Sequence, residues 1–223
     1  MVYLRENLYL GDIIAANEVL LGRSKQKITH ILSVLTELNP VPSKEIRTVY
    51  KDGWPCSGKK IHYVLENAGH DLKVLRMVVP LKDSKRQNLL DNLDVCLDFI
   101  DRGRKNGSVL VHCLAGISRS ASVITAYLMR TERLSVKDAL ASLRQSKPSV
   151  NPNRGFLRQL AMFEEMGFKV DHSSPVYKNF RWKVLGPRGV LSSWLLDVWR
   201  KFSRQILNRI SWTRDGSSHR MHA

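Results

Sequence analysis

Residues 108–120 read SVLVHCLAGISRS. The apolar residues from Val109 to Val111 predict a strand and a helix is predicted to begin at about Ser118, so Cys113 stands where a strand meets a short loop. A free cysteine is most often buried as a small hydrophobic residue. The alternative is a thiolate nucleophile, and the residues around Cys113 bear on the choice.

The segments on either side of this stretch alternate between strand and helix patterns. Strands are predicted at residues 8–10, 28–35, 73–79 and 108–112, and an irregular loop at 39–60. Helices are predicted at residues 13–21, 87–104, 118–131, after the capping box Ser135-x-x-Asp138, and at 153–166. This alternation predicts an α/β domain with a central, mostly parallel sheet flanked by helices. Ligands bind at the carboxyl ends of strands in such sheets, so the loop at 113–119 is a candidate site.

Composition limits the class of protein. Cys56, Cys96 and Cys113 form no Cys-x-x-Cys pair, which argues against a disulfide framework and a structural zinc site, and we expect neither a metal nor a cofactor. The first residues do not resemble a secretory signal, and no apolar segment is long enough for a transmembrane helix. We therefore expect a reducing location, cytoplasmic and/or nuclear. The formal net charge of +16 predicts anionic partners such as phosphorylated substrates, nucleic acid or a membrane surface.

The loop has the chemistry of a phosphate site. Five residues separate Cys113 from Arg119, and a short strand-to-helix loop with a glycine can turn its backbone N–H groups inward. The guanidinium of Arg119 matches two phosphate oxygens. The same positive field lowers the pKa of a cysteine at a helix N-terminus to roughly 3.5 to 7.5. A thiolate beneath a bound phosphate can then attack phosphorus and form a phosphocysteine.

The motif His112-Cys113-x5-Arg119-Ser120 resembles the active-site loop of the cysteine-dependent protein phosphatases, and Ala-Gly-Ile-Ser-Arg-Ser resembles their dual-specificity branch. The similarity extends over about residues 3–185, including LYLGD, ITHILSVL and NPNRGFLRQLAMFEEMGFKVD, and it is greatest for the subgroup called dual-specificity phosphatase twelve. It implies a cysteine-phosphatase catalytic domain at 1–170, a family-like extension at 171–185 and a basic, Trp-containing tail at 186–223. That subgroup usually continues into a Cys-rich zinc-binding domain, and we expect this domain to be absent because no cysteine follows Cys113.

The resemblance also implies roles for individual residues. Cys113 is the expected nucleophile, Arg119 the ligand of the phosphate and transition state, and Ser120 the hydroxyl that assists release of the thiolate. His112 is expected to support the thiolate by hydrogen bonding and not to serve as a base. The expected phosphate cradle consists of the backbone amides of Leu114, Ala115, Gly116, Ile117, Ser118 and Arg119. Ser118 and Ser120 have the alternative role of helix N-cap residues.

The leaving group needs a proton, so a carboxylic acid must reach over the loop. The family takes it from an aspartate before the long helix, which favours Asp83; Asp91 is the alternative, although it fits a solvated helix face. Asn153 matches a family position that steadies the loop, and it also fits a helix N-cap.

The implied function is hydrolysis of phosphotyrosine and phosphoserine or phosphothreonine in proteins through a phosphocysteine. Two alternatives stay open: a phosphatase for lipid or RNA phosphates, and a non-catalytic phosphoprotein-binding or ribosome-assembly module. The neutral side chains inside the loop disfavour the first, and the presence of Cys113 and Arg119 disfavours the second. In the tail, residues 190–210 combine apolar residues at helical spacing with basic ones, as in calmodulin-binding or membrane-surface segments; a helix docked on the domain or a flexible extension is the alternative.

Overall fold

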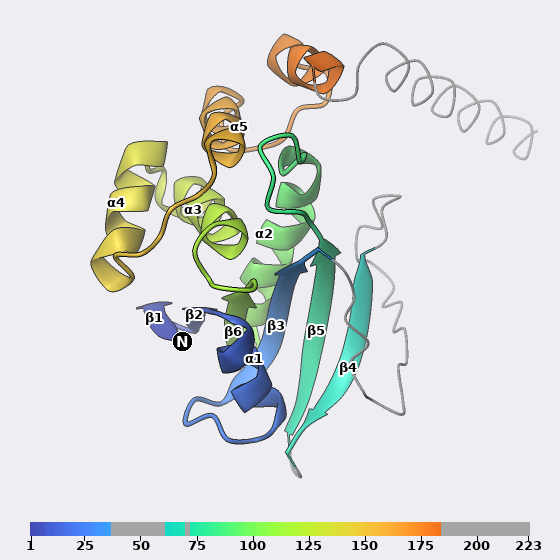
Figure 1. Ribbon diagram of the computed structural model, residues 1–223, viewed down its shortest axis with the longest axis vertical. Helices are drawn as coiled ribbons and strands as arrows, with labels where there is room; N and C mark the ends of the chain where they lie inside the picture. Colours follow the sequence, from blue (N-terminus) through green and yellow to red (C-terminus); the bar gives the residue numbers. More distant parts are fainter. Residues whose placement is uncertain (37–60, 70–71, 184–223) are drawn as a thin grey trace, which may run out of the picture. The chain divides into compact units, whose positions relative to one another are not determined.

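The computed structural model describes residues 1–36, 61–69 and 72–183, and the chain divides into two compact units, Met1–Ser174 and Pro175–Ala223 (Figure 1). In the second unit, residues 175–183 are helical. The predicted irregular loop at 39–60, Cys56 and the tail at 186–223 with its 190–210 segment lie outside the described residues. No helix within the described ranges is long and apolar enough to cross a membrane.

The first unit is built around a six-stranded sheet with the strand order β1-β2-β6-β3-β5-β4 (Figure 1). Four neighbouring strands are parallel: β2 (Leu8–Gly11), β6 (Ser108–His112), β3 (Ile28–Leu35) and β5 (Leu72–Pro80). The edge strands β1 (Val2–Arg5) and β4 (His62–Ala68) pair antiparallel with β2 and β5. The predicted mostly parallel sheet is therefore confirmed, and the two antiparallel edges are additions that the sequence pattern did not predict.

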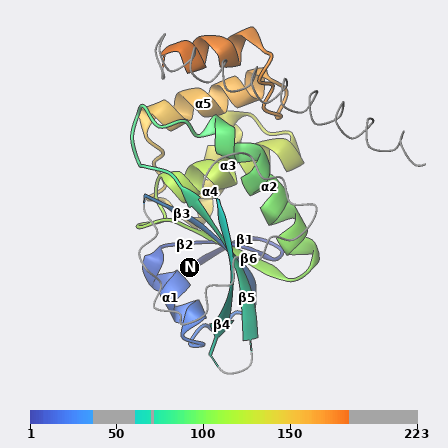
Figure 2. The ribbon, with the colours of Figure 1, turned by 90° about the vertical axis from the view of Figure 1, so that its right-hand side faces the viewer.

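The five helices among the described residues of this unit are close to their predicted positions. They are α1 (Ile13–Leu20), α2 (Leu90–Lys105), α3 (Arg119–Glu132), α4 (Val136–Ser146) and α5 (Arg154–Glu165). α1 and α2 cover opposite faces of the sheet (Figure 2). Ser135 caps α4 by accepting a hydrogen bond from the backbone N–H of Asp138, as predicted. Cys96 is completely buried in α2, so its predicted place in the core is also confirmed.

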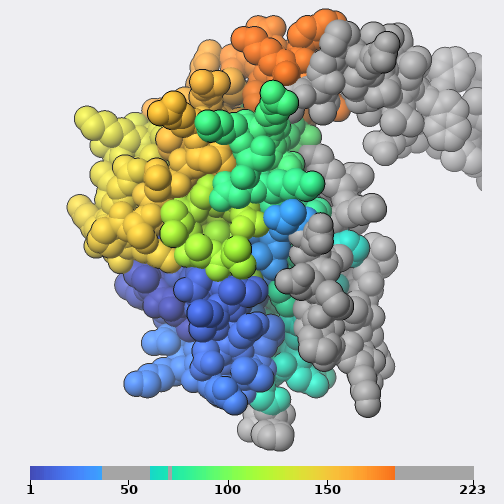
Figure 3. All heavy atoms as spheres, in the orientation of Figure 1, coloured from blue at the N-terminus to red at the C-terminus, as the bar shows by residue number. Residues whose placement is uncertain are grey.

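The central position of β6 determines where the candidate site lies. Val109, Leu110 and Val111 are fully buried, because β6 has β2 on one side and β3 on the other. The four parallel strands end at the same edge of the sheet, so the residues that follow them meet there. The surface around the segment after β6, yellow-green in Figure 3, is accordingly made of blue, green and orange segments that are distant in the sequence.

Candidate active site

The loop after β6 is held from outside by its carbonyl groups. Each of three loop carbonyls accepts one hydrogen bond from a residue outside the loop: Leu114 from the Ile13 N–H at 3.1 Å, Ala115 from Lys147 Nζ at 3.2 Å, and Ile117 from the Asn151 N–H at 3.0 Å. Because these carbonyls point away from the loop's centre, its N–H groups are free to point inward. The anchors come from α1 and from the segment between α4 and α5.

Gly116 makes the tight course of this loop possible. Its φ is +68°, a conformation that side chains disfavour, and a Cβ there would lie 2.5 Å from the carbonyl oxygen of Gly11. The loop can therefore lie directly against the end of β2 only with glycine at this position.

The thiol of Cys113 lies at the bottom of the loop and is almost fully buried, with 2% of the residue exposed. Its Sγ accepts hydrogen bonds from the Gly116 N–H and from the Ser120 hydroxyl, both at 3.2 Å. Burial, the largest single effect, raises the pKa of the thiol, but hydrogen bonds from Ser120, Gly116 and Ile117 together lower it below its ordinary value. The loop therefore favours a thiolate.

Arg119 is the first residue of α3 and is buried beside the thiol. Its Nη1 donates to Thr36 Oγ1 at 3.2 Å and to the Leu81 carbonyl at 3.4 Å, which fixes the guanidinium. Its Nε lies 4.0 Å from Asp83 Oδ2 and, within the described residues, has no hydrogen-bond acceptor. A buried donor without an acceptor is costly, and a phosphate oxygen in the pocket would satisfy it.

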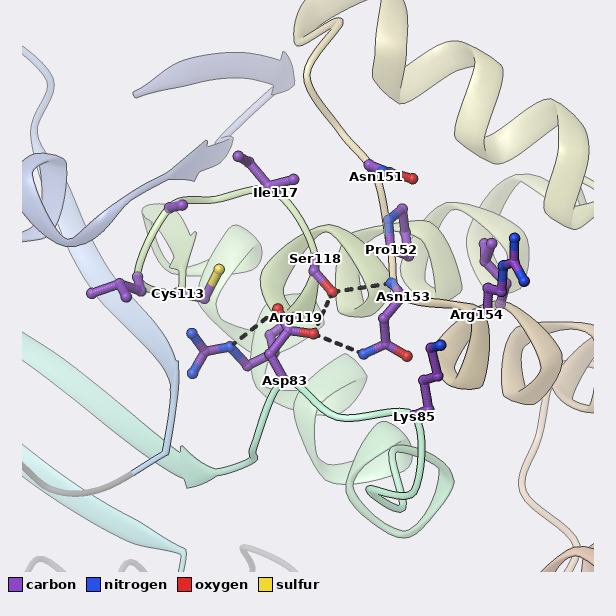
Figure 4. A pocket seen from close by; sticks show the side chains of 13 residues that line it. Asp83, Lys85, Cys113, Ile117, Ser118, Arg119, Asn151, Pro152, Asn153 and Arg154 are labelled. Carbon is purple, nitrogen blue, oxygen red and sulfur yellow. Dashed lines mark hydrogen bonds and ion pairs between the residues drawn. The ribbon is translucent and has the colours of Figure 1, made fainter.

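Asp83 follows β5 and reaches the same pocket (Figure 4). Its Oδ1 accepts hydrogen bonds from the Ser118 hydroxyl at 2.8 Å and from Asn153 Nδ2 at 2.7 Å. With 39% of its side chain exposed, the carboxyl group also remains accessible from solvent. Asp91, the alternative acid, lies in the first turn of α2 and outside the set of described residues that line the pocket.

Asn153 and Ser118 explain how Asp83 is held. Asn153 is the N-cap of α5, where its Oδ1 accepts from the N–H groups of Gly155 and Phe156 while its Nδ2 binds Asp83. Both expected roles of Asn153 therefore have contacts in the structure. Ser118 occupies the N-cap position of α3, as the alternative expected, but its hydroxyl makes no capping hydrogen bond and donates to Asp83 Oδ1 instead.

His112 is completely buried behind the loop. Its Nδ1 lies 3.2 Å from the carbonyl oxygen of Cys113, so this hydrogen bond is to the backbone of the cysteine, and its Nε2 lies 2.7 Å from Ser33 Oγ. Burial and then the positive charge of Arg76 lower the pKa of His112 to about 4, with Arg119 adding to this effect. The Cys113 carbonyl and Asp12 act in the opposite direction.

The side chains meet in an open pocket of about 860 Å³ whose lining includes Asp83, Cys113, Arg119 and Asn153 (Figure 4). Two exposed cations, Lys85 and Arg154, also line it. Sequence reasoning missed these cations, because nothing in the loop motif indicates that the segments after β5 and before α5 meet beside it.

A second group of residues was also missed. Ser33 and Arg76 lie behind His112, and both are buried polar residues within mostly apolar strands. The interruption of KVLRMVV by an arginine is a signal in the sequence, since a strand in the middle of a parallel sheet is usually apolar throughout.

Known proteins resemble this chain over the region that contains the site. The family model described as "Dual specificity phosphatase, catalytic domain" matches residues 8–166. Dual specificity protein phosphatase 12 of Homo sapiens is 45% identical over 107 residues, which cover 48% of this chain and 32% of the human protein. This chain therefore spans about a third of the length of that relative.

Two further comparisons cover more of both partners. Dual specificity protein phosphatase 1 of Arabidopsis thaliana is 34% identical over 163 residues, covering 73% of this chain and 68% of the plant protein. The crystal structure of DUSP15 superimposes with a TM-score of 0.56 at 28% identity, covering 80% of this chain and 93% of that one.

Proposed function

The chain belongs to the dual specificity phosphatase family, and on this premise we propose that it hydrolyses phosphotyrosine and phosphoserine or phosphothreonine in proteins through a phosphocysteine. The main support for the proposal is that two hydrogen-bond donors converge on one thiol. Cys113 Sγ lies 3.2 Å from both the Ser120 hydroxyl and the Gly116 N–H. Arg119 and Asp83 line the same pocket.

In the first step, the Cys113 thiolate attacks phosphorus and forms an S–P bond while the P–O bond to the leaving group breaks. The Asp83 carboxylic acid gives its proton to the departing oxygen. Arg119 and the inward-facing amides of the loop bind the phosphoryl oxygens and stabilise the charge that develops on them.

In the second step, a water molecule attacks phosphorus and gives a proton to the Asp83 carboxylate. The S–P bond breaks, inorganic phosphate leaves and Cys113 returns as a thiolate. The Ser120 hydroxyl, 3.2 Å from Sγ, donates a hydrogen bond that stabilises this leaving thiolate. His112 takes no part in proton transfer in this scheme.

Replacement of the nucleophile tests the proposal. Cys113→Ser is expected to abolish release of phosphate from an aryl phosphate and the trapping of a phosphoenzyme after acid quenching, while circular dichroism shows an intact fold. Cys56→Ser is the matched control and keeps wild-type activity. Full activity of Cys113→Ser would refute the assignment of the nucleophile.

The proposed substrates are phosphorylated proteins, and the proposed location is the cytoplasm and/or the nucleus, where a reactive thiol stays reduced. Binding of residues 190–210 to calmodulin or an anionic membrane surface, and binding of the chain to nucleic acid or a ribosomal particle, are proposals from sequence only. The segment concerned lies outside the described residues.

A substrate panel separates protein phosphates from the other anions. Initial rates are compared for phosphotyrosyl and phosphothreonyl peptides, phosphoinositides and 5′-phosphorylated RNA at equal ionic strength. We expect the peptides to give the highest kcat/KM, because the loop side chains Leu114, Ala115 and Ile117 add no positive charge that would favour a highly charged headgroup. Preference for a phosphoinositide or RNA would replace the proposed substrate class.

A further inference from the structure

A row of buried polar side chains crosses four neighbouring strands and ends at the nucleophile. We call it the buried polar row; it consists of Glu66 on β4, Arg76 on β5, Ser33 on β3 and His112 on β6. Ser33 and His112 lie opposite each other in the parallel register, and Arg76 is opposite Ile31, two residues from Ser33. The side chains therefore share one face of the sheet.

The members of the row are connected without a gap. Arg76 Nη1 lies 3.4 Å from Glu66 Oε1, Arg76 Nε donates to Ser33 Oγ at 2.7 Å, and Ser33 Oγ lies 2.7 Å from His112 Nε2. All four residues are 5% exposed or less. A buried ion pair rarely adds net stability compared with apolar residues, so stability does not explain this row.

Hydrogen-bond chemistry fixes where the protons lie. The Cys113 carbonyl can only accept, so His112 Nδ1 must carry a hydrogen and donate it. Arg76 can only donate, so Ser33 Oγ accepts from it, and the Ser33 hydroxyl hydrogen is then available for Nε2. If His112 were an imidazolium, its Nε2–H would point at Ser33 Oγ, which already accepts a hydrogen bond from the cationic Arg76. The row is satisfied by neutral His112 in the Nδ1–H form.

We propose that Ser33, Arg76 and Glu66 are positioning residues that hold His112 neutral with its proton on Nδ1, so that the imidazole fixes the backbone of Cys113. Arg76 repels a proton from Nε2, the Ser33 hydroxyl occupies that nitrogen as a donor, and Glu66 balances the charge of Arg76 within the sheet. The expected effect on catalysis rests on the proposed role of Cys113 as nucleophile. The proposed protonation state of His112 does not depend on that role.

The other charged groups that face His112 do not change this conclusion. Arg119 at the start of α3 acts in the same direction as Arg76, and Asp12 after β2 acts against both. Burial and the two guanidinium groups outweigh Asp12, which agrees with the lowered pKa of His112.

Nuclear magnetic resonance of the chain with ¹⁵N-labelled histidine tests the proposal directly. The chain has seven histidines, and His112 is assigned by the signal that His112→Asn removes. From about pH 5 to about pH 8, where ordinary histidines titrate, we expect His112 to stay neutral with hydrogen on Nδ1 and none on Nε2. An Nε2–H form, or titration of His112 within this range, would overturn the proposal.

Substitution of Ser33 tests the connection. Ser33→Ala is expected to give a mixture of His112 tautomers and to reduce kcat on an aryl phosphate about ten-fold, with KM little changed, since one buried hydrogen bond is lost. Ser33→Thr keeps the hydroxyl and should restore the single tautomer. The control is Thr125→Val, which removes another buried hydroxyl, one bound to the Ala121 carbonyl within α3, and leaves the His112 spectrum unchanged.

A double substitution tests the ion pair. Glu66→Met combined with Arg76→Met removes both charges together, so that neither is left buried alone, and His112 should then titrate at higher pH than in the wild type. A His112 spectrum unchanged in both Ser33→Ala and the double variant would refute the proposal even if activity fell. Conversely, wild-type protein with neutral Nδ1–H His112 but no phosphatase activity would refute the proposed function and leave the row intact.

Discussion

At the scale of single residues, the two oxygens of Asp83 have different surroundings. Oδ1 accepts hydrogen bonds from Ser118 and Asn153, whereas Oδ2 lies 4.0 Å from Arg119 Nε. A protonated carboxyl has one O–H to donate, and an oxygen that already accepts two hydrogen bonds is poorly placed to carry it. In the proposed mechanism, Oδ2 is therefore the oxygen that donates the proton, and it lies on the side of Arg119, the proposed phosphate ligand.

Removal of this acid should depend on the leaving group. Asp83→Ala is expected to lower kcat for alkyl phosphates by about 100-fold or more, because an alkoxide needs a proton, and much less for aryl phosphates with a good leaving group. The rates are measured with the two substrate types side by side. Asp91→Ala serves as the control and retains wild-type rates; if it alone produces the selective loss, Asp91 is the acid.

The thiolate of Cys113 depends on Ser120 more than on any other single hydrogen-bonding residue. Because the thiolate is the reactive form, alkylation by iodoacetamide should speed up through a pH range below that of an ordinary thiol. Ser120→Ala removes a stabilising donor and should move this midpoint to higher pH. Ser122→Ala, which removes a buried hydroxyl bound to the Ser118 carbonyl, should not move it. All measurements use a Cys56→Ser background.

The sequence motif was sufficient to predict the thiol, the arginine and the loop, because these residues are contiguous and their chemistry follows from a strand, a glycine and a helix start. Asp83 and Asn153 became candidates only through the resemblance to the family, which did not predict that they contact each other, since they are 70 residues apart. Ser33 and Arg76 could not be connected with Cys113 from sequence, because their contact depends on the register of three strands.

At the scale of elements, the segment after β5 and the start of α5 are in direct contact. A Cβ at Gly155 would lie 2.1 Å from the carbonyl oxygen of Lys85. The two backbones are therefore in contact, two residues beyond Asp83 in one segment and two beyond Asn153 in the other. The hydrogen bond between Asp83 and Asn153 therefore depends on the packing of these two segments and not only on the two side chains.

Gly155→Ala should force these segments apart. We expect the free energy of unfolding to fall by about 1–3 kcal/mol and kcat for alkyl phosphates to decrease, because Asp83 loses its support. Urea unfolding and steady-state kinetics measure the two effects. Gly167→Ala is the matched control: its φ of +72° costs about 1–2 kcal/mol, but nothing lies within 4 Å of the added Cβ, so kcat stays unchanged. Equal kinetic losses in both variants would contradict the packing argument.

The helical elements were predictable from apolar spacing, since each buries one side against the sheet or another helix. The other side of α2 was less predictable. On this side, Asp98 accepts a hydrogen bond from Arg130 Nη1 at 3.0 Å, and Asp101 accepts one from the Tyr127 hydroxyl at 2.8 Å. A polar residue that pairs with a neighbouring helix has the same sequence pattern as a solvated one. The strand β4 was also missed from the sequence.

At the scale of the whole molecule, the positive charge around the pocket leads to a prediction about substrate preference. Beyond the phosphate loop, the pocket is lined by the exposed cations Lys85 and Arg154 (Figure 4). Lys85→Glu and Arg154→Glu should each raise KM for phosphopeptides with acidic neighbours, with a smaller effect for a small aryl phosphate, and the difference should shrink at high salt. Lys137→Glu on α4, outside the pocket lining, makes the same change in net charge and should have no such effect.

The free energy of unfolding of the whole domain should depend on pH because His112 is buried. Its pKa is lowered from 6.5 to about 4 in the folded chain, so the unfolded chain binds more protons between these values. Stability is therefore lost as the pH falls through this range, by about 3 kcal/mol for this residue. Chemical unfolding at several pH values measures the slope, and His112→Asn should make it shallower. A wild-type stability that is constant from about pH 6.5 to 4 would contradict this expectation.

The strand order has a consequence for the newborn chain. Among the described strands, β6 is synthesised last, yet it occupies the middle of the sheet between β2 and β3. A ribosome adds residues in sequence order, so β2 and β3 are synthesised before the strand that lies between them in the folded sheet. The donors that activate Cys113 follow still later, at Gly116 and Ser120. Until these donors are in place, the Cys113 thiol lacks the hydrogen bonds that lower its pKa in the folded chain.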